Sequence, residues 1–371
     1  MIDELIKANC IKIGNFKLKN GEVSKYYYDM KNLIAHPQLL RKVGDTIYNM
    51  LDDFDIICGI PYGALPIATY ISTQYNKPMI YIRDKVKSYG TEKLIEGEYK
   101  KEDRCVIIDD VITTGRSLET EILKLQDKVT IVDIAVVFNR QQKPYCSMKF
   151  KALLCKNDVT RYLLQHVKMT KNSNLIFSPD ISDMYLILRM LEKIGKYIVG
   201  CKIHYDIIND CDGDFPFRLT RLSIKHNFLI IEDRKFNDIS YIVSKQYEKF
   251  RNWVDMVTVH SLVSSNVMKE LSGALIVANM SNNTYDFTSE AIELSKECYN
   301  NVVGFITQNR INVEGMVNMT PGISTSDEKI DDQRHRDCKN VDTDFVIVGR
   351  GIYLGDLAGI EDRVKKILYL E

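Results

Sequence analysis

Short apolar runs alternate with longer amphipathic stretches along roughly the first 155 residues of the chain. The runs that are rich in β-branched residues are Ile56–Gly59, Met79–Arg83, Val106–Asp110, Thr130–Phe138 and Ala152–Lys156. Such runs are typical of buried strands, and the helix-compatible stretches between them favour a parallel sheet with crossover helices. The first half is therefore predicted to be an α/β domain.

Eight apolar runs recur in the second half, mostly about 20 to 30 residues apart. They are Leu175–Phe177, Tyr197–Gly200, Phe228–Ile231, Met256–Val259, Ala274–Val277, Val302–Ile306, Val317–Met319 and Phe345–Val348. Polar or glycine-rich residues follow every run, where (β/α)₈ barrels place their active sites. Eight strand–helix units in about 200 residues predict a small TIM barrel, which is also an α/β fold.

Polar residues accumulate near residues 157–172, where no strand is predicted and Thr160–Val167 is expected to be helical. We place the domain boundary there and expect one domain over residues 1–160 and a second over residues 168–371.

Charge and cysteine content exclude several classes of protein. Fifty basic and fifty acidic side chains cancel, so no overall field favours nucleic acid or an anionic membrane. Nine cysteines include no Cys-x-x-Cys pair, which is typical of free thiols in a reducing compartment. No apolar run approaches membrane-spanning length, and the first residues do not resemble a signal peptide. We expect a soluble, cytoplasmic protein.

An apolar run ends in two adjacent carboxylates, Asp109 and Asp110. The loop that follows contains Thr113, Thr114, Gly115 and Ser117, and its backbone N–H groups could wrap a phosphate at the start of a helix. Carboxylates beside a phosphate cradle suggest a ribose hydroxyl pair, a metal, or both. A strand followed by a polar turn is the plainer alternative. The whole pattern resembles the phosphoribosyl-pyrophosphate signature of the type I phosphoribosyltransferases.

Further motifs in this half resemble orotate phosphoribosyltransferase. Leu18–Gly21 and Ser24–Tyr28 match the segment that holds the pyrimidine, and Gly59–Pro66 matches the pyrophosphate loop. The resemblance implies that orotate and phosphoribosyl pyrophosphate are the substrates. The implied binding residues are Lys19, Tyr27, Tyr28, Tyr62, Arg83, Tyr89, Asp109, Asp110, Thr113, Thr114, Gly115, Ser117 and Arg140.

The segment Asp84–Lys101 is charged, contains glycine and has little apolar periodicity. A structureless loop of that length is usually disordered or a functional lid. It resembles the mobile loop of orotate phosphoribosyltransferases, in which Lys87 would stabilise the leaving group. Magnesium is expected for this step, held mainly by pyrophosphate and water rather than by protein ligands. Two positions depart from the family. Asp84 stands where many members have lysine, and Gly63 stands where some members have lysine.

The strongest motif of the second half is Asp233–Asp238, with the sequence Asp-Arg-Lys-Phe-Asn-Asp. Residues two apart on a strand share a face, so Asp233 and Lys235 are expected to point the same way. Lys202 and Asp180 follow neighbouring runs and could complete an alternating array of charges. A solvated charge patch is the alternative for any one pair.

This half resembles orotidine 5′-monophosphate decarboxylase over nearly its whole length. The resemblance implies a catalytic tetrad of Lys202, Asp233, Lys235 and Asp238, with Asp238 reaching into the neighbouring subunit of a homodimer. It implies that Lys235 protonates C6 of the pyrimidine without any cofactor. The implied binding residues for orotidine monophosphate are Asp180, His204, Ser281, Pro321, Gln333, Gly349, Arg350 and Gly351. His335, Ile242 and Asn279 depart from common family residues.

The order of the two halves resembles that of the bifunctional uridine 5′-monophosphate synthases. The resemblance implies that the chain converts orotate to orotidine monophosphate and then to uridine monophosphate. Two alternatives stay open at this point: an enzyme with one active half, more readily the decarboxylase, and a non-catalytic sensor of nucleotides or phosphoribosyl pyrophosphate.

Overall fold

The computed structural model describes residues 1–17, 23–83, 94–113, 115–140, 148–209, 214–282, 285–324, 328–330 and 333–369. The chain divides into two compact units. One contains residues 1–13 and 26–156, and the other contains residues 14–25 and 157–371. The division differs from the predicted domain ranges in two respects, since residues 14–25 and residues 157–160 group with the second half of the chain.

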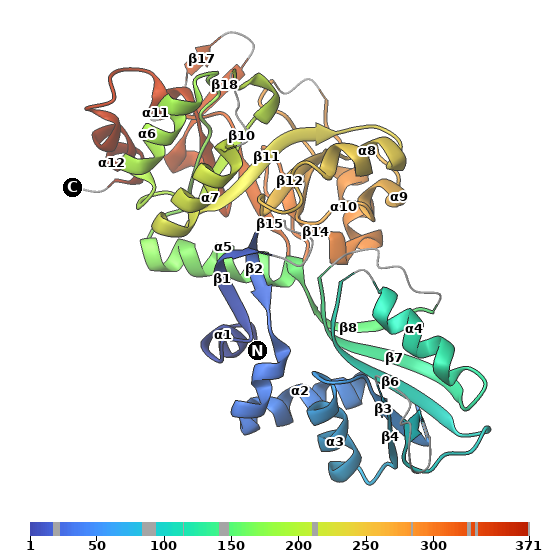
Figure 1. Cartoon of the computed structure of the whole chain (residues 1–371). Coiled ribbons are helices and arrows are strands. Elements are labelled where there is room, and N and C mark those ends of the chain that lie inside the picture. The colour runs from blue at the N-terminus through green and yellow to red at the C-terminus, as the bar shows by residue number, and fades with distance from the viewer. Residues whose placement is uncertain are drawn as a thin grey trace. The chain divides into compact units, whose positions relative to one another are not determined.

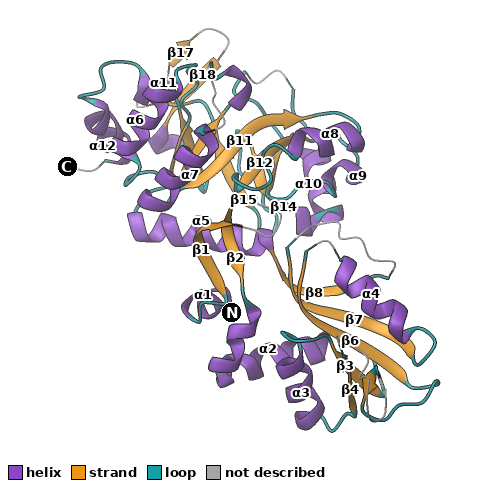
Figure 2. Ribbon diagram, in the orientation of Figure 1, coloured by secondary structure: helices purple, strands orange, loops and turns teal. Residues whose placement is uncertain are grey.

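The first unit is built on a six-stranded sheet (Figures 1 and 2). Its strand order is β5-β4-β3-β6-β7-β8, and only β5 runs antiparallel to its neighbour. The strands are β3 (Ile56–Gly59), β4 (Met79–Ile82), β5 (Ile95–Glu96), β6 (Arg104–Ile112), β7 (Thr130–Asn139) and β8 (Lys151–Cys155). The helices are α1 (Ile2–Lys7), η1 (Met30–Ala35), α2 (Pro37–Met50), α3 (Leu65–Gln74) and α4 (Arg116–Leu125). The parallel sheet predicted for this half is confirmed.

The second unit is a closed barrel of eight parallel strands. They are β9 (Leu175–Phe177), β10 (Gly200–Ile203), β11 (Leu229–Phe236), β12 (Met256–His260), β13 (Ala274–Val277), β14 (Val302–Ile306), β15 (Val317–Thr320) and β19 (Phe345–Val348). The predicted TIM barrel is therefore confirmed, with a strand at or beside each of the eight runs.

Helices follow most of these strands. They are α6 (Met184–Ile194), α7 (Phe215–His226), α8 (Ser240–Tyr247), α9 (Ser265–Met268), α10 (Thr288–Glu297), α11 (Arg350–Tyr353) and α12 (Ile360–Leu368), with short helices η2 (Tyr205–Ile207), η3 (Tyr299–Asn301) and η4 (Cys338–Asn340). Helix α5 (Lys156–Lys171) precedes the first strand of the barrel. A small sheet of β16 (Ile323–Ser324), β18 (Gln333–Asp337) and β17 (Glu328–Ile330) lies between β15 and β19 in the sequence.

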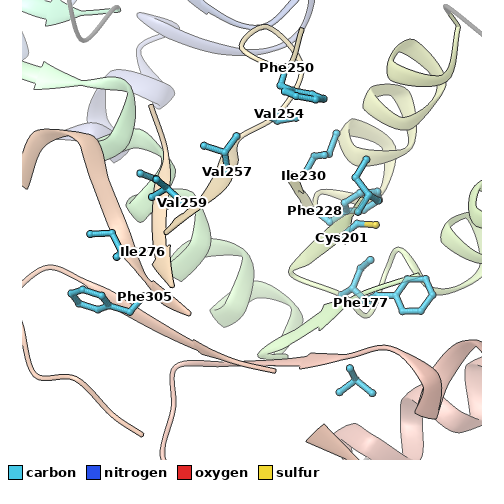
Figure 3. Close-up of a cluster of buried hydrophobic side chains, with 14 of the residues drawn as sticks. Phe177, Cys201, Phe228, Ile230, Phe250, Val254, Val257, Val259, Ile276 and Phe305 are labelled. Atoms are coloured by element: carbon cyan, nitrogen blue, oxygen red, sulfur yellow. The ribbon is translucent and has the colours of Figure 1, made fainter. Parts of the chain in front are cut away.

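The main core of the second unit lies between the barrel and its helices. Outward-facing side chains such as Ile230, Val257, Val259, Ile276 and Phe305 are fully buried in it (Figure 3). Because strand residues alternate between the two faces of a sheet, the residues between them point into the barrel. Each strand therefore stabilises the fold with one face and leaves the other face for chemistry.

Two strands extend beyond their predicted ends into charged residues. β10 starts at Gly200, the last residue of the predicted run, and β11 continues to Phe236. Polar residues predicted to follow these strands, including Lys202 and Asp233, therefore lie within them. The ladder explains the difference, because Lys202 pairs with Ile231 and Ile203 with Glu232. In the first half, Ile95–Glu96 forms β5 within the segment predicted to be a structureless loop.

One buried ion pair links an early part of the chain to the barrel. The strands β1 (Ile11–Lys17) and β2 (Val23–Tyr28) form a two-stranded sheet, and Lys25 on β2 belongs to the second unit. Lys25 Nζ donates to Asp255 Oδ2 at 2.7 Å and to Ser223 Oγ at 2.9 Å. Asp255 is fully buried and also accepts from the backbone N–H of Ile230 at 2.7 Å. Lys25, near the start of the sequence, thus neutralises a carboxylate that is buried in the barrel unit.

Two further observations concern the described residues. No helix among them is long and apolar enough to cross a bilayer. Their seven cysteines are all free thiols.

Candidate active sites

Asp233 is the centre of a dense group of polar side chains inside the barrel. Its Oδ2 accepts from Lys202 Nζ and lies 3.3 Å from His204 Nε2. Its Oδ1 lies 2.9 Å from Lys235 Nζ and accepts from Thr258 Oγ1 at 2.7 Å. These residues come from the adjacent strands β10, β11 and β12, with His204 directly after β10. Both oxygens of one buried carboxylate are therefore held by cations or hydrogen-bond donors.

The charges of this group follow from burial and neighbours. Burial alone would raise the pKa of Asp233, but Lys202, Lys235 and His204 hold it well below its usual range. Burial opposes the charge of Lys202, yet Asp233 and Asp180 raise its pKa above the ordinary value. Burial and the nearby Lys202 lower the pKa of His204, so its imidazole is neutral at pH 7. The site therefore contains an ionised carboxylate and a charged ammonium group that are largely removed from water.

The backbone of Lys235 has an unusual conformation. Its φ angle is +50°, in the left-handed region that residues other than glycine rarely adopt. The pairing of β11 with β12 shifts here, since Glu232 pairs with Val257 but the next pair is Phe236 with Val259. The irregularity and the left-handed backbone thus lie at Lys235, between two residues of the strand that pair regularly with β12.

A cavity of about 230 Å³ opens next to these charges. The residues predicted from the sequence that line it are Asp180, Lys202, His204, Asp233, Lys235, Ser281, Pro321, Gly349 and Arg350. Gly349 and Arg350 lie at the start of α11, directly after β19. The structure thus brings together charged groups from β9 to β11 and an arginine that follows the last strand.

Asp238 is the tetrad member that the structure does not bring into the cavity. Its side chain is exposed, and its Oδ1 accepts from the backbone N–H of Ile239 at 2.7 Å. Gly351 is adjacent to the cavity residue Arg350 but does not line the cavity. Gln333 and His335 lie on β18, and their side chains are outside the described part of the structure.

Several lining residues were not predicted as site residues. They are Ser178, Val277, Met280, Asn282, Ile306, Gly322, Ile323 and Ile347. Val277, Ile306 and Ile347 belong to apolar runs, where the sequence gives no chemical signal, and the others lie one to five residues beyond a run. Thr258 was also missed. The available signal was a hydroxyl side chain in the middle of the apolar run Met256–Val259, but threonine is common in strands.

In the first unit, Asp109 and Asp110 lie within β6, which continues two residues beyond the end predicted for this strand. Asp109 is buried and its Oδ1 accepts from the N–H of Asp110 at 2.8 Å. Burial and the charge of Asp110 raise the pKa of Asp109 to about 7, and burial also raises the pKa of Asp110. Two carboxylates this close favour a partner that donates hydrogen bonds or carries positive charge.

The pyrophosphate-loop candidate lies directly against Asp110. A Cβ atom built on Gly63 would be 1.9 Å from Asp110 Oδ2. A side chain at this position would therefore require Asp110 to shift. Tyr62, next to it, is exposed. Gly115, with φ +78°, begins α4 beside Thr113, and Ser117 is exposed in the first turn of that helix.

The remaining described candidates of this unit lie on different elements. Tyr28 stacks on Phe138 with ring centroids 4.0 Å apart, and Arg140 donates its backbone N–H to Ile112 O at 2.9 Å. These contacts bring Tyr28 to β7 and Arg140 to the end of β6. Tyr27 is partly exposed, with Lys12 Nζ 5.7 Å from its ring centroid. Arg83 Nε lies 2.5 Å from Glu96 Oε1 on β5. Lys19, Lys87, Tyr89 and Thr114 are outside the described residues.

Comparison with known proteins assigns a family to each unit. Residues 29–160 match the phosphoribosyl transferase domain, and residues 173–356 match the orotidine 5′-phosphate decarboxylase / HUMPS family. The chain is 29% identical to the uridine 5′-monophosphate synthase of Bos taurus, over 95% of this chain and 92% of that protein. The chain belongs to the bifunctional uridine 5′-monophosphate synthase family.

The first half also matches single-function relatives. It is 40% identical to the orotate phosphoribosyltransferase of Methanosphaera stadtmanae, over 44% of this chain and 96% of that protein. It is 39% identical to the corresponding protein of Methanocaldococcus jannaschii, over 38% of this chain and 81% of that protein. In this chain a transferase half precedes a decarboxylase half, and the matches support the bifunctional interpretation over the two alternatives left open by the sequence.

Proposed function

We propose that the chain makes uridine monophosphate in two successive reactions. Orotate and phosphoribosyl pyrophosphate first give orotidine monophosphate and pyrophosphate, and decarboxylation of that nucleotide then gives the product. The observation that carries the proposal is the group of Lys202, Asp233 and Lys235 in one cavity with Arg350. An ionised carboxylate lies between two lysines, and the guanidinium group of Arg350 lines the same cavity and could bind a phosphate. This arrangement suits a nucleotide whose reacting group is a carboxylate.

In the transferase half, we propose that Asp109 and Asp110 accept hydrogen bonds from the ribose hydroxyls of the sugar donor. The raised pKa of Asp109 supports this role, because donors stabilise a buried carboxylate that otherwise tends to be protonated. The backbone N–H groups of the loop before α4 would bind the 5′-phosphate. Tyr28 and Arg140 would hold the planar, anionic orotate.

We propose that Mg²⁺ assists this first step. Within the described residues, no cluster of three or more carboxylate, imidazole or thiol side chains could hold a metal. The Asp109–Asp110 pair suits an ion that is bound mainly by pyrophosphate and water. The ion would offset negative charge on the departing pyrophosphate, together with Lys87.

In the decarboxylase half, we propose that Asp233 lies beside the substrate carboxylate. Two adjacent negative charges are unfavourable in the bound substrate, and the repulsion ends when carbon dioxide leaves. The ammonium group of Lys235 would stabilise the negative charge that develops at C6 and then donate a proton to it. Arg350 and the backbone at Gly349 would bind the phosphate. No cofactor is needed for these steps.

We propose that the decarboxylase works as a homodimer with shared sites. Asp238 is exposed rather than in its own cavity. The large apolar side chains of Ile239, Tyr241, Leu262 and Tyr285 are also exposed, and they follow the consecutive strands β11, β12 and β13. An apolar surface next to an unused catalytic carboxylate favours a second copy of the chain, whose cavity Asp238 would enter.

The free thiols support a reducing, cytoplasmic location.

Two variants test the assignment of one reaction to each half. Lys235→Ala should abolish release of carbon dioxide while orotidine monophosphate accumulates, because the proton donor is lost but the first site is intact. Lys87→Ala should slow the first step and leave added orotidine monophosphate decarboxylated at the wild-type rate. In each variant, the activity that is retained shows that the chain is folded. Loss of both activities in either variant would contradict the division of labour.

A further inference from the structure

Thr258 bridges two members of the charged group. It is fully buried in the middle of β12. Its hydroxyl donates to Asp233 Oδ1 at 2.7 Å and accepts from the backbone N–H of Lys235 at 2.9 Å. A single hydroxyl therefore uses both its donor and an acceptor position on the residues that the proposed chemistry depends on.

The irregular pairing of β11 and β12 explains why this bridge is needed. Between the pairs Glu232–Val257 and Phe236–Val259, three residues of β11 stand opposite Thr258 alone. A regular ladder hydrogen bond cannot serve every N–H of such a bulge. The hydroxyl of Thr258 satisfies the N–H of Lys235 at the residue whose φ is +50°.

We infer that Thr258 is a positioning residue for decarboxylation. It holds the Lys235 backbone in its left-handed conformation and fixes the orientation of the Asp233 carboxylate. Together these contacts set the 2.9 Å separation of Lys235 Nζ and Asp233 Oδ1. The side chain acts through these two groups and does not line the cavity. The inference rests on the proposed decarboxylase function.

A purely structural role would have different consequences. If Thr258 only filled space in the barrel, its substitution would lower stability but leave turnover by the folded enzyme unchanged. If it positions Lys235 and Asp233, turnover should fall while ground-state binding through Arg350 and the phosphate persists. Small misplacements of catalytic groups can cost on the order of 100-fold in rate.

The experiment compares Thr258→Val, which removes the hydroxyl at nearly constant volume, with Thr258→Ser, which keeps it. Thr220→Val is the control, because Thr220 is a buried threonine on helix α7 of the same unit, and its hydroxyl donates to Pro216 O at 2.7 Å, away from the cavity. For each full-length variant, kcat and KM for orotidine monophosphate, inhibition by uridine monophosphate and the transferase rate are measured.

We expect Thr258→Val to lower the decarboxylase kcat about 10- to 100-fold, with KM and product inhibition changed by less than about 3-fold. Thr258→Ser should return kcat to within about 3-fold of wild type, and Thr220→Val should not lower it. Should the Val variant fail to bind product, Thr258→Ala supplies the same comparison with less crowding. An unchanged kcat in a product-binding Val or Ala variant, or a Ser variant as slow as that variant, would overturn the inference. A wild-type enzyme that does not decarboxylate would instead overturn the proposed function.

Discussion

Two neighbouring carboxyl groups on β11 differ in protonation state because their side chains lie on opposite faces of the strand. Asp233 faces the lysines inside the barrel, which hold its pKa well below the usual range. Glu232 is fully buried, and its carboxyl oxygens accept from the backbone N–H of Tyr205 at 3.2 and 3.3 Å. Burial raises the pKa of Glu232 to about 8, so this group is largely protonated at neutral pH.

The carboxyl of Glu232 gives the barrel a pH-dependent stability. Its pKa is about 8 in the folded chain and near its ordinary value of 4.5 when the chain is unfolded, so the folded state binds the extra proton between these values. Stability should therefore fall as pH rises from about 5 to 8, by up to about 1.4 kcal/mol per pH unit. Glu232→Gln should flatten this slope, because an amide does not titrate. Denaturant midpoints of decarboxylase activity at several pH values measure it.

The exposed residue Glu293 on α10 provides the control for this prediction. Glu293→Gln should leave the slope as in the wild-type chain. Equal slopes for Glu232→Gln and wild type would show that Glu232 does not bind the proton.

At the level of elements, the sequence predicted the strands better than the site. Ala274–Val277, Val302–Ile306 and Phe345–Val348 match β13, β14 and β19 at both ends because purely apolar runs are buried strands. The limits of β10 and β11 could not be found in this way, since charged residues face the barrel interior within these strands. Lys202, Asp233 and Lys235 were therefore predicted to follow strands that in fact contain them.

Tertiary contacts account for the features that the sequence did not reveal. Thr258 looks like an ordinary strand residue until the ladder places it opposite the bulge of β11. Lys25 stands in a motif that resembles a pyrimidine-binding segment, yet its ammonium group is buried against Asp255. Neither contact follows from local periodicity, because each joins residues that are far apart in the chain.

The Lys25–Asp255 pair predicts that an early residue stabilises the barrel. Lys25→Met leaves Asp255 buried without its charged partner, which should lower stability by about 3–5 kcal/mol. Loss of decarboxylase activity in urea measures the effect. Lys25→Met combined with Asp255→Asn should recover part of the loss, because the amide oxygen can still accept from Ile230.

A lysine in a more exposed pair is the control. Lys12 lies 3.1 Å from Asp29, and both side chains are partly exposed. Lys12→Met should change stability by at most about 1 kcal/mol. An equally small effect of Lys25→Met would contradict the importance of the buried pair.

At the level of the whole molecule, the exposed position of Asp238 predicts that two inactive variants can restore each other. In a mixed dimer of Asp238→Ala and Lys235→Ala chains, one site has both Lys235 and the partner's Asp238, and the other site has neither. Co-expression in equal amounts should give about a quarter of the wild-type decarboxylase activity, since half of the dimers are mixed. The specific activity of the purified mixture is the measurement. Activity no greater than the sum of the separate variants would place Asp238 in its own subunit's site.

The proposed function requires that one chain catalyses both reactions in order. The most direct measurement supplies the purified wild-type protein with Mg²⁺, phosphoribosyl pyrophosphate and orotate labelled at its carboxylate carbon. We expect labelled carbon dioxide and uridine monophosphate to form in equal amounts, and neither to form when phosphoribosyl pyrophosphate is omitted. Accumulation of orotidine monophosphate without labelled carbon dioxide, or no consumption of orotate at all, would contradict the account.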